Sequence, residues 1–171
     1  MIRTRIALAV GAVALLASAP LAAQTSCNTS GCVVTVNAHA TVNDVLLMDV
    51  GTSSTDLGTP LAADYTAGFK DAGGPTVHVT SNRPYDVTVS TTASQFTYSG
   101  SLTDPAKPVS DLQWGTAAGT YTNDASASAT LMSGNPTADD LQQIFFRTNW
   151  DIASDVPGDY TVALDFTLTT P

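Results

Sequence analysis

The chain contains no glutamate, because all 15 of its acidic residues are aspartate. Helix surfaces use Glu freely, whereas Asp is typical of caps and turns. Positive residues are also few, since six lysines and arginines in 171 residues leave a formal net charge of -9. So few cations cannot neutralise a phosphate backbone or an anionic lipid surface. The composition therefore predicts strands and turns, and it argues against nucleic acid or a membrane surface as a partner.

Motifs for catalysis and for cofactor binding are missing as well. No G-x-S-x-G, H-E-x-x-H, phosphate loop or dinucleotide fingerprint occurs. The two histidines, His39 and His78, each fall on the polar side of an expected strand. An imidazole there is solvated and is not held in place as a catalytic base. The acidic residues at 139–140 and 151–159 lack the alternating order of a calcium loop. We expect no catalytic residue, no metal and no cofactor.

The N-terminal residues differ in composition from the rest of the chain. Arg3 and Arg5 precede a continuous apolar run over residues 6–16, and small residues follow up to Ala23. This order of charge, apolar run and small residues is that of a cleavable secretory signal peptide. We expect residues 1–23 to be removed, leaving residues 24–171 as one domain without a membrane span. Because Arg3 and Arg5 leave with the signal, the net charge falls from -9 to -11.

Only two cysteines are present, Cys27 and Cys32, and both follow the expected cleavage site. An oxidising compartment favours a disulfide between them, closing a small loop over residues 28–31. No second cysteine pair or nearby histidine completes four zinc ligands. We therefore expect an exported protein, in the periplasm, at the cell surface or outside the cell, that carries one disulfide.

Apolar and polar residues alternate along several segments, which is the pattern of half-buried strands. The clearest segments are 34–42, 77–79, 85–89 and 160–169, with shorter ones at 45–50, 96–98, 112–114, 127–131 and 144–150. Turn residues separate them at 71–75, 81–84, 104–105, 133–136 and 156–159. Only 137–143 has a helical pattern, of about one turn. The prediction is an all-β fold, a single immunoglobulin-like antiparallel β-sandwich.

Aromatic residues offer the main candidates for a ligand surface. Most share the parity of apolar neighbours and are expected in the core, but Trp114 beside Gly115, and Tyr121, are least explained by packing. Both are therefore candidate ligand contacts. Exposed coplanar rings would suit a carbohydrate-binding module that acts in trans, and glycans are then the partner. A hydrolase that uses a pair of Asp residues is a third, weaker hypothesis.

Two stretches resemble bacterial surface proteins. The run 157–171, a Gly turn that leads into a Tyr strand, is similar to the closing motif of WxL-domain proteins, with Phe166-Thr167-Leu168 in place of Trp-x-Leu. This resemblance implies a non-catalytic β-sandwich attached to the Gram-positive cell wall. The run 76–90 resembles a stretch of pilin-like and spore-coat-U-like secreted proteins.

The first functional hypothesis is therefore a secreted or cell-surface structural or adhesive protein without chemistry of its own. Its partners would be other surface proteins or further copies of itself. Either end of the chain carries a strand pattern that could be donated to a neighbouring copy, and the sequence does not choose between the two ends.

Overall fold

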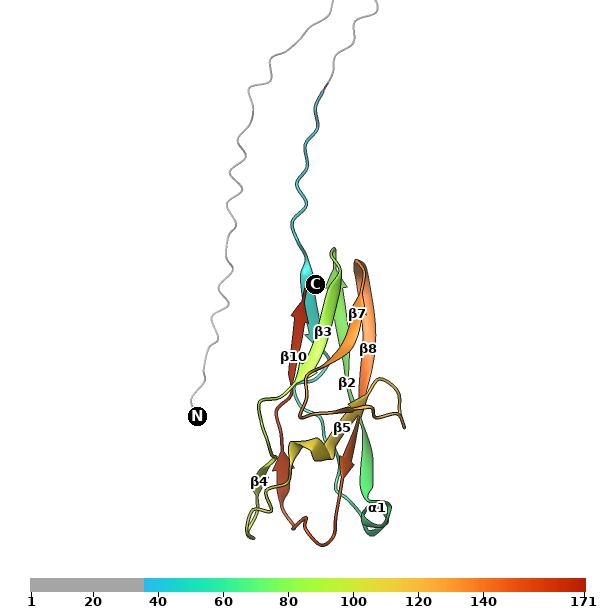
Figure 1. The fold of residues 1–171 in the computed structure, drawn as a ribbon. Helices are drawn as coiled ribbons and strands as arrows, with labels where there is room; N and C mark the ends of the chain where they lie inside the picture. The colour runs from blue at the N-terminus through green and yellow to red at the C-terminus, as the bar shows by residue number, and fades with distance from the viewer. Residues whose placement is uncertain (1–35) are drawn as a thin grey trace, which may run out of the picture. The chain divides into compact units, whose positions relative to one another are not determined.

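A computed structural model describes residues 36–171, and residues Val42–Pro171 form one compact unit. The expected signal peptide at 1–23 and the expected Cys27–Cys32 disulfide lie outside the described residues. The unit is almost entirely antiparallel β-structure with little helix (Figure 1). Its elements are β1 (Leu46–Val50), α1 (Ala62–Ala67), β2 (Phe69–Ser81), β3 (Tyr85–Ser90), β4 (Thr97–Ser99), the 3-10 turn η1 (Val109–Asp111), β5 (Leu112–Gly115), β6 (Asn123–Asp124), β7 (Ala129–Gly134), β8 (Thr137–Asn149), β9 (Asp159–Thr161) and β10 (Asp165–Thr169).

The strands form three antiparallel sheets. A five-stranded sheet has the order β1-β2-β8-β5-β6, a three-stranded sheet has the order β10-β3-β7, and β4 pairs with β9. The two longest strands of the first sheet, β2 and β8, pair with each other, with Phe69 opposite Asn149 and Ser81 opposite Thr137. In this arrangement β1 is an edge of the five-stranded sheet and β10 is an edge of the three-stranded sheet.

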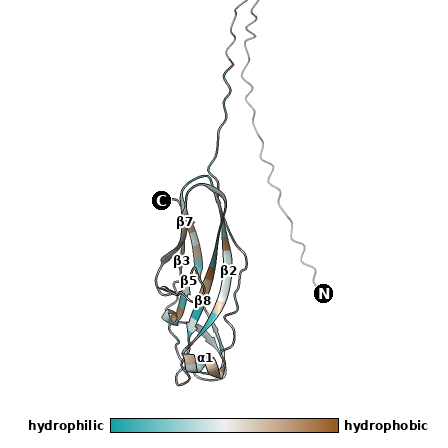
Figure 2. Ribbon diagram, turned by 90° about the vertical axis from the view of Figure 1, so that its right-hand side faces the viewer, coloured by the Kyte–Doolittle hydropathy of each residue, from teal (hydrophilic) through white to brown (hydrophobic). Residues whose placement is uncertain are grey.

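One hydrophobic core is shared by both larger sheets. Successive side chains of a strand point to opposite faces, so the alternating sequence pattern buries every second residue. In Figure 2 both hydrophobic and hydrophilic stretches occur along β2 and β8. The core side chains are Val77, Val79, Tyr85, Val87, Val89, Phe96, Val109, Leu112, Trp114, Ala125, Leu131, Met132, Ile144 and Phe146.

Several strand predictions are confirmed, but two expected turns are not. Residues 71–75 lie inside β2, where the pairing with β8 shifts between Gly73 and Thr76. An ideal Cβ on Gly74 would stand only 2.5 Å from Phe146 Cε2, so glycine here permits the close approach of two strands and forms no turn. Residues 137–143 begin β8 and form no helical turn, because pairing with β2 overrides a weak local preference.

The two segments with the clearest alternation also differ from expectation. Residues 160–169 form two strands, because β9 pairs with β4, β10 pairs with β3, and 162–164 between them lie in no strand. The other segment, 34–42, is described from residue 36 onwards, and residues 36–42 are in no strand and fully on the surface. A strand needs a neighbour to satisfy its backbone groups, and these residues have none within the described chain.

The chain before β1 is fixed by the turn between β2 and β3. The Val45 N–H donates to Asn82 Oδ1 at 2.9 Å, and the Asn82 N–H donates to the Val45 carbonyl at 3.1 Å. The Asn82 side-chain amide donates to the Asn43 carbonyl at 2.8 Å, and Arg83 pairs with Asp44 at 2.7 Å. These contacts extend the direction of β1 backwards to residue 43. None of the helices described in residues 36–171 has the length and apolar character needed to cross a bilayer.

Candidate functional site

The two edge strands β1 and β10 lie near one another on the same side of the domain (Figure 1). Strand β1 pairs only with β2, and β10 pairs only with β3, so each has a second edge that pairs with no strand of the described part of the chain. The N–H and C=O groups on such an edge can accept a further strand. Protected edge strands usually carry charged side chains, Pro or a bulge, and of these β10 carries a single charge, Asp165, within Asp165–Thr169.

Between the segment that follows β1 and the segment that leads into β10, the surface is hollowed into what we call the edge groove. Two adjoining hollows share part of their lining, including Leu57 and Val162. One wall is formed by residues 52–60, which follow β1, and the other by residues 158–166, which contain β9 and lead into β10. The floor consists of three core side chains, Phe96, Leu112 and Phe146, and of the half-buried Trp150.

Apolar side chains that line the edge groove remain partly exposed to solvent. Side chains along both walls contact the core but are only partly buried, in contrast to the central strands. They are Leu57 on one side and Val162, Leu164 and Phe166 on the other. An uncovered apolar strip beside free backbone groups is a feature of a peptide-binding edge.

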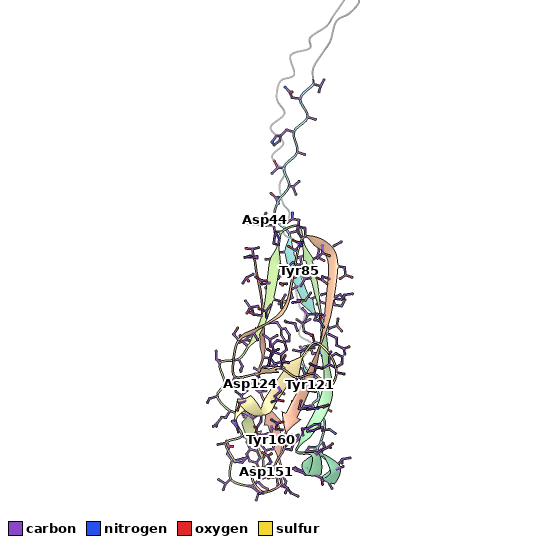
Figure 3. The ribbon with its side chains drawn as sticks, turned by 45° about the vertical axis from the view of Figure 1, so that its right-hand side comes forward. Asp44, Tyr85, Tyr121, Asp124, Asp151 and Tyr160 are labelled. Carbon is purple, nitrogen blue, oxygen red and sulfur yellow. The ribbon has the colours of Figure 1, made fainter. Side chains whose placement is uncertain are left out.

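An aromatic cluster closes the end of the groove near α1. The Tyr160 ring stands edge-on to Trp150, with centroids 5.5 Å apart, and it lies 5.3 Å from the Tyr98 ring. The Tyr160 hydroxyl donates to the Val156 carbonyl at 2.7 Å and accepts from the Val156 N–H at 3.0 Å. Burial raises the pKa of Tyr160 above its usual value. Figure 3 shows Tyr160 near this end of the domain and Tyr85 near the other.

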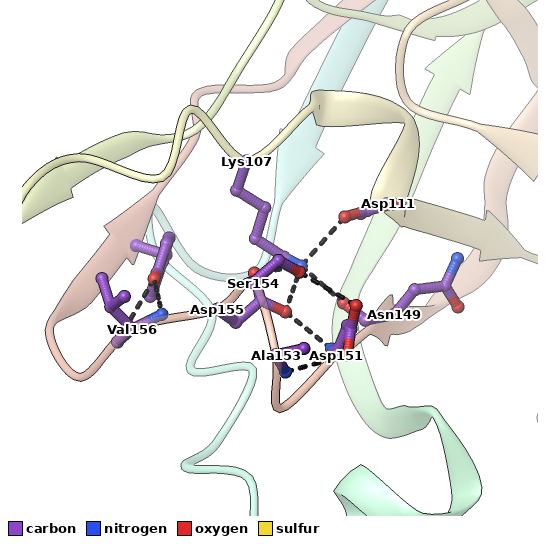
Figure 4. Close-up of polar contacts among 9 residues, drawn as sticks. Lys107, Asp111, Asn149, Asp151, Ala153, Ser154, Asp155 and Val156 are labelled. Carbon is purple, nitrogen blue, oxygen red and sulfur yellow. Dashed lines mark hydrogen bonds and ion pairs between the residues drawn. The ribbon is translucent and has the colours of Figure 1, made fainter.

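Behind Trp150 lies a charged cluster centred on Lys107 (Figure 4). Lys107 is only 3% exposed, and its ammonium contacts Asp111 at 2.9 Å, both oxygens of Asp155 at 2.9 and 3.0 Å, and the Asn149 carbonyl at 2.7 Å. The three ammonium protons therefore have three acceptor groups. The ammonium also stands 4.6 Å from the centroid of the Trp150 ring. Such a fully paired ion fixes the loop 149–155 and, with it, the floor of the edge groove.

Sequence reasoning missed Lys107 as a structural residue. Two features of the sequence point weakly to this role. Lys107 lies four residues before Asp111, and it is one of only four lysines and arginines after residue 23. The partner Asp155 lies 48 residues away, on a loop whose path follows from the fold and not from local sequence.

The two predicted ligand contacts lie apart from the groove openings. Trp114 is 0% exposed in the core, and its indole N–H has no partner in the described structure, so its ring offers no surface to a sugar. Tyr121 is half-buried against the Arg147 guanidinium, which lies 4.5 Å from its ring and 3.6 Å from that of Phe69. Arg147 also forms two hydrogen bonds to Asp71, at 2.7 and 2.9 Å, and thereby lowers the pKa of that carboxyl.

Several acidic residues form local hydrogen bonds and ion pairs. Asp151 accepts hydrogen bonds from the Ala153 N–H at 2.9 Å and the Ser154 hydroxyl at 3.1 Å. Asp140 accepts from the Tyr85 hydroxyl, and Asp139 lies 3.4 Å from the ring of His78 on the surface. In the part of the chain that the structure describes, no three His, Cys, Asp or Glu residues gather as metal ligands.

Comparison with known proteins adds no assignment. No family model, no curated protein and no solved structure matches this chain. The interpretation therefore depends on the geometry of the edge groove, which combines an apolar floor with two free strand edges.

Proposed function

We propose that this protein is exported and acts without catalysis as a structural or adhesive subunit at the cell surface. Its domain is an immunoglobulin-like antiparallel β-sandwich that lacks a strand at one edge, and it works by accepting a strand from a partner along the edge groove. The observation that carries this proposal is the pair of edge strands, β1 and β10, beside a groove floored by core side chains.

The chemistry of the groove supports a peptide strand as the ligand. Strand addition uses main-chain hydrogen bonds for affinity and pockets for every second side chain for specificity. The free edge of β10 offers main-chain N–H and C=O groups for hydrogen bonds, and the groove floor around Leu112 and Phe146 offers pockets for side chains. A carbohydrate module would present exposed aromatic rings, whereas Trp114, the main candidate for such a ring, is buried in the core.

Self-association of the protein tests the proposal. The full-length chain is expressed, and the form that accumulates is purified and followed by light scattering and electron microscopy. We expect concentration-dependent oligomers or filaments. A protein that stays monomeric at high concentration would contradict assembly through this groove.

A matched pair of variants links any assembly to the groove. Leu164→Asp puts a charge on the half-buried wall, whereas Thr167→Asp adds the same charge on the exposed face of β10. We expect the first variant to lose assembly by at least about tenfold in affinity and the second to keep it. Thermal unfolding of both variants checks that each remains folded.

A further inference from the structure

The charged cluster around Lys107 brings an amine into contact with two carboxylates inside the domain (Figure 4). The Lys107 ammonium lies 2.9 Å from Asp111, and 3.0 and 2.9 Å from the two oxygens of Asp155. The side chains of Lys107 and Asp155 are only 2% and 6% exposed. An amine and a carboxyl group that are held together away from water are the two reactants of an amide bond.

The contact between Lys107 and Asp155 has the separation that such a reaction needs. The carboxyl carbon of Asp155 lies between the two oxygens that the ammonium contacts. This places the carbon at the distance of about 3–3.5 Å from which a held pair reacts, and effective concentrations in such pairs reach about 10⁵–10⁸ M. Burial also favours the product, because the reaction replaces two buried charges by one neutral amide.

The other contacts of the pair match the groups that the reaction uses. Asp155 Oδ2 accepts a hydrogen bond from the Asp151 N–H at 2.8 Å, and a backbone N–H so placed stabilises the negative oxygen of a tetrahedral intermediate. Within the described residues, Asp155 Oδ1 contacts only the ammonium, so Oδ1 is the oxygen that is free to leave. The Asn149 carbonyl, 2.7 Å from the ammonium, can accept the N–H of the new amide.

We propose that Lys107 and Asp155 react after folding to form an intramolecular amide bond, with Asp111 as the proton carrier. Asp111 takes a proton from the ammonium, and the neutral Nζ attacks the carboxyl carbon of Asp155. The Nζ–Cγ bond forms, the Cγ–Oδ1 bond breaks, and the oxygen leaves as water with two of the three ammonium protons. The third proton stays on the amide nitrogen. Asp111 ends as the carboxylate that it was at the start, and no oxidant or external reagent is consumed.

The bond joins two segments that lie far apart in the sequence. Lys107 precedes η1, and Asp155 lies 48 residues later, in the loop between β8 and β9. Trp150 packs on the same nitrogen, with 4.6 Å from Nζ to the ring centroid, so the bond also fixes the floor of the edge groove. This inference goes beyond the proposed function and does not depend on it.

Mass spectrometry of tryptic peptides tests the bond in the protein as it accumulates. The full-length chain is expressed, and the accumulated protein is reduced, unfolded and digested. Trypsin cleaves after Arg147, between the two partners, but not after Arg83 or Lys107, which precede proline. We expect peptides 71–147 and 148–171 to remain joined, at the sum of their masses less one water. Complete separation of these peptides would overturn the proposal.

The more exposed pair of Lys70 with Asp64 is a control in the same digest. Its ammonium contacts one carboxylate oxygen at 3.2 Å, and its side chains are 23% and 25% exposed. The reacting groups are the same but are open to water, so we expect normal cleavage after Lys70. Cross-linking of both pairs to the same extent would contradict selection by burial and geometry.

The variant Lys107→Arg keeps the positive charge but removes the amine that attacks. We expect its peptides 71–147 and 148–171 to separate completely, and thermal unfolding checks that the variant is folded. Peptides that stay joined in this variant would overturn the assignment of the bond to Lys107.

The variant Asp111→Asn tests the proton carrier. The amide oxygen still accepts a hydrogen bond from the ammonium but does not take its proton. We expect the joined peptides to form at least about a hundredfold more slowly, followed in samples taken after a short pulse of synthesis. An unchanged rate would overturn the role of Asp111. The digest of the unmodified chain decides whether the bond exists, whether or not this variant folds.

Discussion

Lys107 shows how single residues set the shape of the edge groove. A buried ammonium is tolerated only when it is paired and hydrogen-bonded, and this one is held by Asp111, Asp155 and a backbone carbonyl. Trp150 packs on the ammonium from the groove side. The charged cluster and the aromatic floor therefore depend on one another.

Replacement of Lys107 by Met should be strongly destabilising. The variant leaves the carboxylate of Asp155, whose side chain is 6% exposed, buried without its cation. We expect a loss of about 3 kcal/mol or more in the free energy of unfolding, measured by urea titration. Arg83→Met, which breaks the exposed pair with Asp44, is the control and should cost less than about 1 kcal/mol. A similar small loss for both variants would contradict the structural role of Lys107.

The raised pKa of Tyr85 predicts that the folded domain becomes less stable at alkaline pH. Burial, together with the hydrogen bond to Asp140, raises the pKa of Tyr85 from 10.0 to about 12. The folded state therefore holds this proton more tightly than the unfolded state does. The resulting stability is complete below about pH 10 and is lost as the pH rises to about 12, up to about 3 kcal/mol. In Tyr85→Phe this component of the pH dependence should disappear; an unchanged slope of stability against pH between 10 and 12 would contradict it.

Residue patterns in the sequence predicted core positions better than surface roles. Val77, Val87 and Phe166 were expected on apolar faces, and all three belong to or contact the core. Trp114 beside Gly115 was considered poorly explained by packing, but its side chain is 0% exposed in the core. In fact an ideal Cβ on Gly115 would stand 1.9 Å from the Thr120 carbonyl oxygen, so this glycine marks a close backbone contact in the core.

At the scale of elements, alternation located strands but did not reveal which strands had partners. It predicted β2, β3 and β8 in part, and it equally predicted a strand over 34–42, of which the described residues 36–42 form none. Pairing is a property of the whole chain, because it depends on segments far apart in sequence. The helix α1 was missed because six residues carry too little periodicity to identify.

The irregularity in β2 gives a prediction at this scale. A Cβ on Gly74 would meet Phe146 at 2.5 Å and Ile144 Cγ2 at 2.7 Å, whereas one on Gly73 would meet only the Gln143 amide at 3.8 Å. We expect Gly74→Ala to destabilise the domain by about 1–3 kcal/mol. Gly73→Ala, one residue away in the same strand, should change stability by less than about 1 kcal/mol. Thermal or urea unfolding distinguishes them, and equal stabilities would show that β2 and β8 are not packed this closely.

The chain combines an expected export signal at residues 1–23, an acidic β-domain, and residues 36–42, which have the sequence pattern of a strand but form no strand. Neither the groove nor its floor was visible in the sequence, since residues 52–60 and 158–166 are brought together only by the sheet order. The sequence left open which end of the chain could donate a strand. The C-terminal strand β10 already pairs with β3, whereas residues 36–42 remain free of any strand.

The proposed export predicts that the accumulated protein has a defined N-terminus and one disulfide. After expression of the full-length chain in a bacterial host, intact-mass analysis should show a chain that begins at Gln24. Its mass should be two hydrogens below that of the reduced form, because Cys27 and Cys32 are paired. Retention of residues 1–23 in the accumulated protein would contradict the signal peptide, and an unchanged mass on reduction would contradict the disulfide.

The central claim is that β10 has a free edge that a further strand covers, and amide hydrogen exchange measures this directly. Exchange is compared between the assembled protein and the variant Leu164→Asp, which carries a charge on the groove wall. We predict that amides of β10 and of residues 162–164 exchange rapidly in the variant and become protected in the assembly, while β8 is equally protected in both. Equal protection of β10 in the two samples would contradict the claim that this edge accepts a strand.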